Sequence, residues 1–286
     1  MGQIEINHTG SGGTVVLSSD GTDLLLGGSA VGGSPDLFAE NPSSATTPSA
    51  TGTNAVAIGS GSVASGQKTF AIGTDTDATG SFSFAIGQGA QATANYNLAI
   101  GLNAVSSGER AVAIGNNSVT ASGSWSTAIG NNSSNGGSKA VAIAAMALGG
   151  SYASGANSFA AAIANNTSSY GATAANSIAI GYQSKASSGY GVAIGRSCQA
   201  GDTSFATGSS ALATGAKAFS HGLNTTASAS YSKASGREAL SNIEGKSARA
   251  SGKFSAQGDA QGGQFILRSD TTNATAEAMT TNNSTA

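Results

Sequence analysis

The sequence predicts an all-β protein, a parallel β-roll or solenoid of about 14 coils with a 14-residue period. Three observations lead to this prediction. A pattern of a small residue, any residue, Ala, Ile and Gly recurs from residue 52 onward, and most steps between copies are 14 residues long. Large and small residues alternate within each copy, which is the period of a β-strand. A glycine closes most copies, as a turn with positive φ requires.

Alignment of the copies on their closing position gives columns of equivalent residues. The closing positions are Gly59, Gly73, Gly87, Gly101, Gly115, Gly130, Ala144, Ala164, Gly181, Gly195, Gly208, Gly222, Gly236 and Gly252. The position before them holds an isoleucine ladder, which we expect to form the core: Ile58, Ile72, Ile86, Ile100, Ile114, Ile129, Ile143, Ile163, Ile180 and Ile194. Two positions before the closing residue, every copy has Ala except Ser220. We expect this Ala face to let another layer of backbone approach closely.

A second, weaker strand motif follows half a unit later, as in Ala64-Ser65-Gly66. Each unit therefore contains two short strands and two turns, which make one coil. Coils stacked about 4.8 Å apart would give a rod of roughly 65 Å. Because so thin a coil buries little apolar surface, we expect the chain to oligomerise, with the Ala column as the contact.

The lengthened step between Ala144 and Ala164 carries new residues at 145–155. Extra residues in a solenoid emerge as loops on one side, often the binding side, and drift of the repeat explains them equally well.

The ends of the chain differ from the repeats. Residues 1–33 read as a small β element with strands at 3–6, 14–17 and 23–26, suited to attachment or to capping the rod. Residues 34–51 contain all three prolines and read as a linker. The repeats span 52–258, and 259–286 read as the start of a C-terminal β module that the chain does not complete.

Composition and charge argue against several classes of function. Charged residues are 9% and aromatics 6%, both low for a compact enzyme, and the net charge of −2 gives no support for nucleic-acid binding. Cys198 is the single cysteine, which excludes an intrachain disulfide and a zinc site built from cysteines. No apolar run is long enough for membrane insertion, and no signal peptide is visible. No catalytic arrangement stands out, so we expect neither an enzyme nor a cofactor or metal.

Charge is unevenly distributed along the chain. Residues 1–51 hold five acids and no Lys or Arg, whereas 233–268 hold six bases and three acids. The two ends are therefore expected to meet different neighbours, unless both are simply solvated.

One column, five positions before the closing residue, mixes aromatic and cationic side chains. We take these as a candidate receptor ladder: Phe82, Tyr96, Arg110, Trp125, Lys139, Tyr190, Lys217 and Tyr231. Their aromatic faces could stack on sugars while the bases meet anionic groups. Self-stacking and cation–π contacts along the rod edge are the alternative. His221 interrupts the isoleucine ladder and could bind a metal or an anion in an oligomer, or be purely structural.

The motif Ala55-Val56-Ala57-Ile58-Gly59, followed by Val63-Ala64-Ser65-Gly66 and repeated every 14 residues, resembles the head repeats of YadA-like trimeric autotransporter adhesins. The resemblance implies a left-handed roll in an intertwined homotrimer. The same repeat occurs in bacteriophage tail fibres, and the segment from Gly252 to Gln261 resembles a junction in such fibres.

The resemblance thus predicts a structural fibre of a phage tail or virion appendage that spaces or presents receptor binding. Residues 1–33 would attach to a baseplate or adaptor, and a host surface glycan or protein would be the receptor. The alternative is the head of a bacterial trimeric adhesin on the cell surface. An ice-binding solenoid or a polysaccharide-cleaving spike has less support, because Thr is scattered and acids are scarce in the rod.

Overall fold

The structure is a computed structural model that describes residues 46–130, 137–162 and 169–267, together with four short strands nearer the N-terminus. The chain divides into two units, residues 1–45 and 46–286. The first unit is an antiparallel meander in chain order of β1 (Ile4–Ile6), β2 (Val15–Ser19), β3 (Leu24–Leu26) and β4 (Ser29–Ala30). The first three correspond to the predicted strands. The proline-containing residues 34–45 lie outside the described residues.

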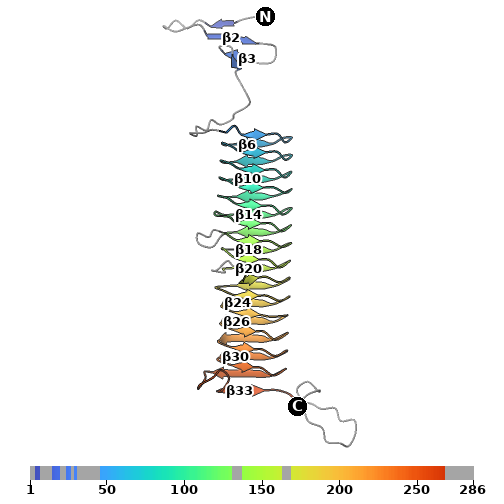
Figure 1. Cartoon of the computed structure of the whole chain (residues 1–286), viewed down its shortest axis with the longest axis vertical. Coiled ribbons are helices and arrows are strands. Elements are labelled where there is room, and N and C mark those ends of the chain that lie inside the picture. The colour runs from blue at the N-terminus through green and yellow to red at the C-terminus, as the bar shows by residue number, and fades with distance from the viewer. Residues whose placement is uncertain are drawn as a thin grey trace, which may run out of the picture. The chain divides into compact units, whose positions relative to one another are not determined.

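The second unit is a parallel β-roll made of two sheets (Figure 1). The long-strand sheet contains β6 (Val56–Ile58), β8 (Phe70–Ile72), β10 (Phe84–Ile86), β12 (Leu98–Ile100), β14 (Val112–Ile114), β16 (Thr127–Ile129), β18 (Met146–Leu148), β20 (Phe159–Ala161), β22 (Ile178–Ile180), β24 (Val192–Arg196), β26 (Phe205–Ser209), β28 (Phe219–Leu223), β30 (Lys233–Arg237), β32 (Ser247–Ser251) and β33 (Gln261–Gln264). The short-strand sheet contains β5 (Ser49–Ala50), β7 (Val63–Ala64), β9 (Asp77–Ala78), β11 (Gln91–Ala92), β13 (Val105–Ser106), β15 (Thr120–Ala121), β17 (Lys139–Ala140), β19 (Tyr152–Ala153), β21 (Gly171–Ala172), β23 (Lys185–Ala186), β25 (Gln199–Ala200), β27 (Leu212–Ala213), β29 (Thr226–Ala227) and β31 (Leu240–Ser241).

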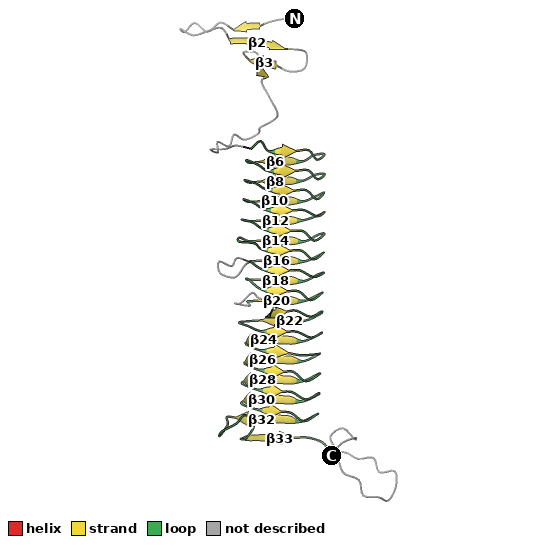
Figure 2. Cartoon of the chain, viewed as in Figure 1, coloured by secondary structure: helices red, strands yellow, loops and turns green. Residues whose placement is uncertain are grey.

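One short and one long strand make each coil, and the 14 coils of parallel strands confirm the predicted solenoid (Figure 2). Neighbouring coils are in register, so that Ala85 pairs with Ala99 and Ile86 with Ile100. Like residues therefore form columns along the rod.

Two corners in most coils have positive φ. The closing glycine at one corner has φ between 96° and 139° in most coils, for example 123° at Gly87. A Cβ on Gly87 would lie 2.7 Å from the carbonyl oxygen of Gly101 in the next coil. Only glycine meets both conditions, which is why it recurs at this position.

The interior of the roll is lined by alanine rather than isoleucine. The middle residue of the long strands, such as Ala71, Ala85 and Ala99, is fully buried, and so is the inward residue of the short strands, such as Ala64. Val119 is the largest side chain among those fully buried. The two sheets thus lie too close together for larger residues.

The prediction that the isoleucine ladder forms the core is therefore wrong. The ladder lies on the outer face of the long-strand sheet, where Ile86 is 37% exposed and Ile129 39% exposed. The expected contact between chains through the Ala column is wrong for the same reason, because the opposite sheet of the same coil covers that column.

Polar interior side chains satisfy the backbone at the corners. Thr69 donates to the carbonyl of Gly66 at 2.9 Å, and Ser83 donates to that of Gly80 at 2.6 Å. Asn97 bridges two chain segments, donating to Ser106 and accepting from the Ala111 amide. These short hydroxyl and amide groups fit the thin interior and leave few buried groups without a partner.

The structure shifts the repeat between residues 131 and 168. Met146–Leu148 is a regular long strand, with Leu148 paired to Ile129, so residues 145–155 are not an insertion. Ile143 is 61% exposed and lies outside the long-strand column, and Ile163 lies outside the described residues. The additional residues fall instead between β16 and β17 and between β20 and β21.

The C-terminal end of the rod is closed by its own chain. β33 pairs antiparallel with β32, so residues 261–264 extend the long-strand sheet. The Gln261 side chain accepts from the Leu240 amide at 2.7 Å and donates to the Leu240 carbonyl at 2.8 Å, which satisfies the edge of the short-strand sheet. This arrangement covers an otherwise open sheet edge.

Candidate binding surfaces

The outer face of the long-strand sheet is apolar over most of its length. From β6 to β24 its two outward columns hold mainly Val, Phe, Leu, Met and Ile. We call this the apolar face. Phe84 is 42% exposed and Met146 40% exposed, so a single chain leaves large apolar side chains in contact with solvent. Continuous apolar surface of this kind marks a contact with another surface.

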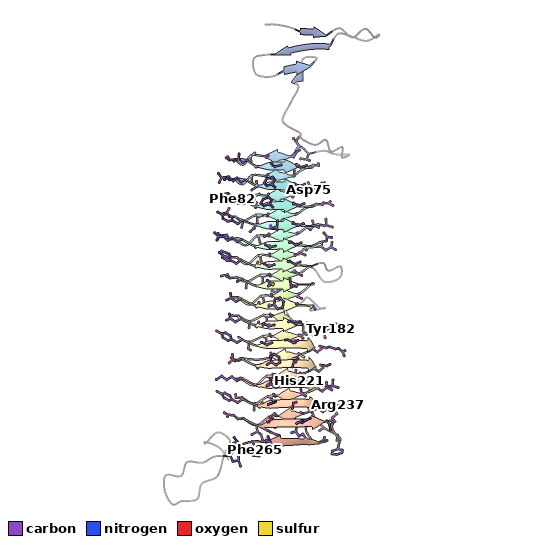
Figure 3. All side chains as sticks on the ribbon, turned by 180° about the vertical axis from the view of Figure 1, so that it is seen from behind. Asp75, Phe82, Tyr182, His221, Arg237 and Phe265 are labelled. Carbon is purple, nitrogen blue, oxygen red and sulfur yellow. The ribbon has the colours of Figure 1, made fainter. Side chains whose placement is uncertain are left out.

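The candidate receptor ladder lies along one edge of the rod, where the chain passes from a short strand to a long one. We call this edge the ladder corner. Figure 3 shows Phe82 there, with Asp75, Tyr182 and Arg237 at the opposite edge. Every described non-glycine residue of the ladder corner has a left-handed conformation, including Trp125 at φ 62°. Large side chains in this conformation are strained, so a contact or a function must favour them.

Five consecutive coils form one stack at the ladder corner. The Lys68 ammonium lies 5.2 Å from the Phe82 ring centroid, and the Phe82 and Tyr96 rings stack 5.1 Å apart. The Arg110 guanidinium lies 5.0 Å from the Tyr96 ring and 4.6 Å from the Trp125 ring. Both faces of Phe82 and Tyr96 are thus covered by neighbouring coils, so neither face is open to a sugar.

Three aromatic rings of the ladder corner keep an open face. Trp125 meets Arg110 on one side, and the next coil places only Ala144 at this corner. The neighbours of Tyr190 are Asn176 and Thr203, and its side chain is 64% exposed.

Tyr231 is contacted from one side by Lys217, whose ammonium lies 4.9 Å from the ring and donates to the Tyr231 hydroxyl at 2.9 Å. This hydrogen bond is the main cause that raises the pKa of Lys217. The following coil has Gly245 at the corner, so the other face of the Tyr231 ring meets no side chain there.

One residue of the candidate ladder is misplaced by sequence alignment. Lys139 lies in β17 of the short-strand sheet, paired with Thr120 and Tyr152, and not at the ladder corner. The ladder position of its coil is Ala144, whose amide donates to the Ser124 carbonyl as the other corner residues do to theirs. The sequence missed this because the additional residues before β17 shifted the alignment.

Two further titratable groups of the described rod have raised pKa values. Burial and the nearby Asp75 raise the pKa of Asp77, and burial raises the pKa of the Cys198 thiol, which donates to backbone carbonyls. Across residues 46–130, 137–162 and 169–267, no three His, Cys, Asp or Glu side chains gather where they could hold a metal ion. The same part of the chain contains no helix that could cross a membrane.

Comparison with known proteins agrees with this geometry. The YadA head domain repeat family matches residues 50–76, 78–96, 98–118 and 172–197. These segments cover coils in which the isoleucine column is regular. No curated protein matches the chain. Neither result bears on a tail fibre, a virion or a baseplate contact, which stay predictions. The rod therefore contains YadA-like head repeats in the four matched segments.

Proposed function

We propose that the chain is the head of a bacterial surface adhesin, a rod that associates with copies of itself and binds a host surface through its exposed edge. The observation that carries the proposal is the apolar face, which a single chain leaves in contact with water. The match of its coils to a known adhesin-head repeat supports the same proposal.

Self-association through the apolar face follows from its size and composition. Each coil from β6 to β24 contributes two outward side chains, most of them large and apolar, and these columns run in register along the rod. Burial of such area contributes about 25 cal/mol per Å². Three chains is the number that the resemblance implies, and we propose a homotrimer.

Receptor binding is proposed for the open aromatic faces of the ladder corner, and not for the stacked middle of the ladder. Trp125, Tyr190 and Tyr231 are 58%, 64% and 57% exposed. Each has a face that no neighbouring coil covers, so each can stack on a sugar ring or an apolar side chain of a host surface.

The association is tested by sedimentation equilibrium of the full chain. We expect the mass of three chains for the native protein, and a monomer for the double variant Ile86→Lys and Ile100→Lys, because two buried ammonium groups per chain would oppose contact. Gln91→Lys, on the outer face of the short-strand sheet, is the matched control and should remain trimeric. A native protein that sediments as a monomer contradicts the proposal.

Adhesion is tested separately, with the labelled full chain applied to fixed animal cells and to bacterial cells. We expect the native chain to bind animal cells. The double variant Trp125→Ala and Tyr190→Ala should bind them at least about tenfold less tightly. Phe82→Leu is the control, because the Phe82 ring is covered on both faces, and this variant should bind as the native chain does. Binding to bacterial envelopes alone would contradict the adhesin proposal and favour the tail-fibre prediction.

A further inference from the structure

The outer face of the long-strand sheet changes character in its last four coils. The isoleucine column ends at Ile194 and continues as Thr207, His221, Ser235 and Arg249. In the parallel column Phe219 is followed by Lys233. Cationic side chains therefore replace the apolar ones at this end of the rod, where Figure 3 labels His221.

The cationic side chains surround a hollow that the short residues between them leave open. Ser235 has His221 and Arg249 on either side in its column, and Lys233 lies two residues before it on the same strand. Diagonal neighbours across adjacent strands lie about 7–8 Å apart, within reach of one another's long side chains. The hollow has a volume of about 850 Å³ and includes all four residues in its lining. We call it the basic hollow.

Glycines keep the basic hollow wide. β33 crosses its far side with Gly262 opposite Arg249, and a Cβ built on Gly262 meets no atom within 4 Å. Gly236 and Gly263 also line the hollow. A neighbouring hollow joins Arg249 to Arg237 at the rod edge, so positive charge continues along the surface.

No acidic side chain of the described residues neutralises the basic hollow. Glu238 pairs with Lys253 at 3.4 Å, and Asp259 accepts from three backbone amides. Glu244 lies outside the lining of the basic hollow, in an adjoining hollow beside Phe265 that shares Ser247, Gly263 and Gln264 with it. Lys233 lies 5.6 Å from the Phe219 ring, and neither it nor Arg249 has an ion pair within the described part of the chain. The charges here are left for a ligand.

We propose that the basic hollow binds a tetrahedral oxyanion, sulfate or phosphate. The Arg249 guanidinium offers a planar fork of donors, the Lys233 ammonium a compact charge, and the His221 ring an N–H donor. Ser235 lies between His221 and Arg249 in the column, and its hydroxyl, which donates to the Ala248 carbonyl at 3.4 Å, keeps its acceptor side for a water or a protonated oxyanion. Arrangements of this kind match the several acceptor oxygens of an oxyanion. The inference does not depend on the proposed receptor binding, because the hollow lies away from the open aromatic rings. The hollow does continue the same face of the long-strand sheet as the apolar face, so in the proposed trimer it would lie towards the partner chains.

The same chemistry has two sources, a free ion and a sulfated oligosaccharide. Titration calorimetry of the full chain at fixed ionic strength, with sodium sulfate and with a heparin-derived octasaccharide, separates them. Binding of both to the hollow indicates a small-ion site that also accepts a chain. Binding of the octasaccharide alone indicates a glycan site that uses Arg237 as well. Absence of binding by both ligands overturns the proposal.

Matched variants locate the binding. Lys233→Gln and Arg249→Gln should each weaken it at least about tenfold, whereas Lys185→Gln, which removes the same charge from the short-strand sheet, should leave it within about twofold. Gly262→Glu should abolish binding and Gly262→Gln should weaken it less, because both fill open space and only one adds a negative charge. Equal loss in Lys185→Gln would show that bulk charge alone attracts the ligand and would overturn the site.

Discussion

At the scale of single residues, side-chain size decides which face of a strand points inward. In β12 the order Leu98, Ala99, Ile100 alternates large and small, and the fully buried residue is the small one. Coils this flat hold two backbone layers with mainly methyl groups, hydroxyl groups and small amides between them, and Val119 is the largest fully buried side chain. Close packing of that layer replaces the large apolar core of a globular domain.

Enlarging an interior alanine should therefore be costly. We expect Ala99→Leu to lower the free energy of unfolding by about 1–3 kcal/mol, because three added carbons have no space between the sheets. Val105→Leu, on the outer face of the next strand, should change it by less than about 0.5 kcal/mol. Chemical denaturation monitored by circular dichroism measures both. Similar losses in the two variants would mean that the interior is not the limiting space.

The alternation itself was predictable from the sequence, and its direction was not. Side chains along a strand alternate with a period of two residues, which places Ala99 and Ile100 on opposite faces. This alternation does not determine which face is buried. The assumption that the larger residue lies inside holds for ordinary sheets. It fails here because the distance between the two sheets is set by the two-residue short strands and tight corners, which leave no space for Ile.

At the scale of elements, the corner stacks act as connections between coils. The Arg110 guanidinium lies between the Tyr96 and Trp125 rings, at 5.0 and 4.6 Å, and thereby links three successive coils. The Arg110 side chain also pairs with Glu109 at 2.9 Å. The stack opposes separation of these coils from one another, at positions where the left-handed backbone costs energy.

A double-mutant cycle should measure this connection. With Arg110→Gln, Trp125→Leu and the double variant, we expect a coupling free energy of about 0.5–1 kcal/mol in thermal unfolding, the range for an exposed cation–π pair. The cycle of Arg110→Gln with Tyr190→Leu, whose residues lie several coils apart, should give no coupling. A coupling free energy near zero for Arg110 and Trp125 would mean that this contact does not connect the coils, and that the Trp125 ring is free for other contacts.

The C-terminal loop that precedes β33 is held by two carboxylates. Asp259 accepts from the amides of Phe254, Ser255 and Ala256 at 2.6–2.8 Å, and these hydrogen bonds lower its pKa. The Asn224 hydrogen bond is the main cause that lowers the pKa of Glu238, helped by Lys253. Both groups are more acidic in the folded chain, so their contribution is complete above their ordinary values of 3.8 and 4.5. It is lost as the pH falls further, through the lowered folded values.

Removal of one carboxylate should open the loop at neutral pH. We expect Asp259→Ala to increase the rate of trypsin cleavage after Lys253 at least about fivefold, because three backbone amides lose their acceptor and a charge-assisted bond is worth more than a neutral one. Asp202→Ala, at an exposed corner, should leave cleavage unchanged. In the native chain, the amide shifts of Ser255 and Ala256 should move only as the pH falls below 3.8, the ordinary pKa of Asp259. Shifts that stay constant would show that Asp259 does not hold the loop.

The order of elements could be predicted only where the period is regular. From β6 to β16 the predicted columns are those observed, and the matched corners include Phe82, Tyr96, Arg110 and Trp125. After Gly130 the additional residues before β17 shift the alignment, so that Val141-Ala142-Ile143 matches the sequence pattern of a long strand. Pairing with neighbouring coils, rather than local pattern, selected Met146–Leu148 instead. The sequence predicts the basic hollow only as an excess of basic residues near the C-terminal end of the repeats. The pairing register of the strands, which the structure gives, is what brings His221, Lys233 and Arg249 around Ser235.

At the scale of the whole molecule, the rod unit is a one-dimensional stack in which each coil contacts only the coils before and after it. The stability of such a stack is approximately a sum over coils and their interfaces. Register along the columns, rather than any single contact, keeps the stack continuous. A change that preserves the register should therefore be tolerated, even when it removes a large segment.

Deletion of one complete coil tests this directly. Removal of residues 88–101 joins Gly87 to Leu102, pairs Ile86 with Ile114 and places Phe82 beside Arg110, so every column continues with an equivalent residue. We expect a folded rod, shorter by about 4.8 Å in small-angle scattering and with an unchanged circular dichroism spectrum. Removal of residues 88–94, half a coil, should abolish cooperative unfolding, because the long strand of the next coil would have no short strand before it. Loss of structure in both deletions would mean that the coils are not interchangeable and that stability depends on particular contacts such as the Lys68-to-Trp125 stack.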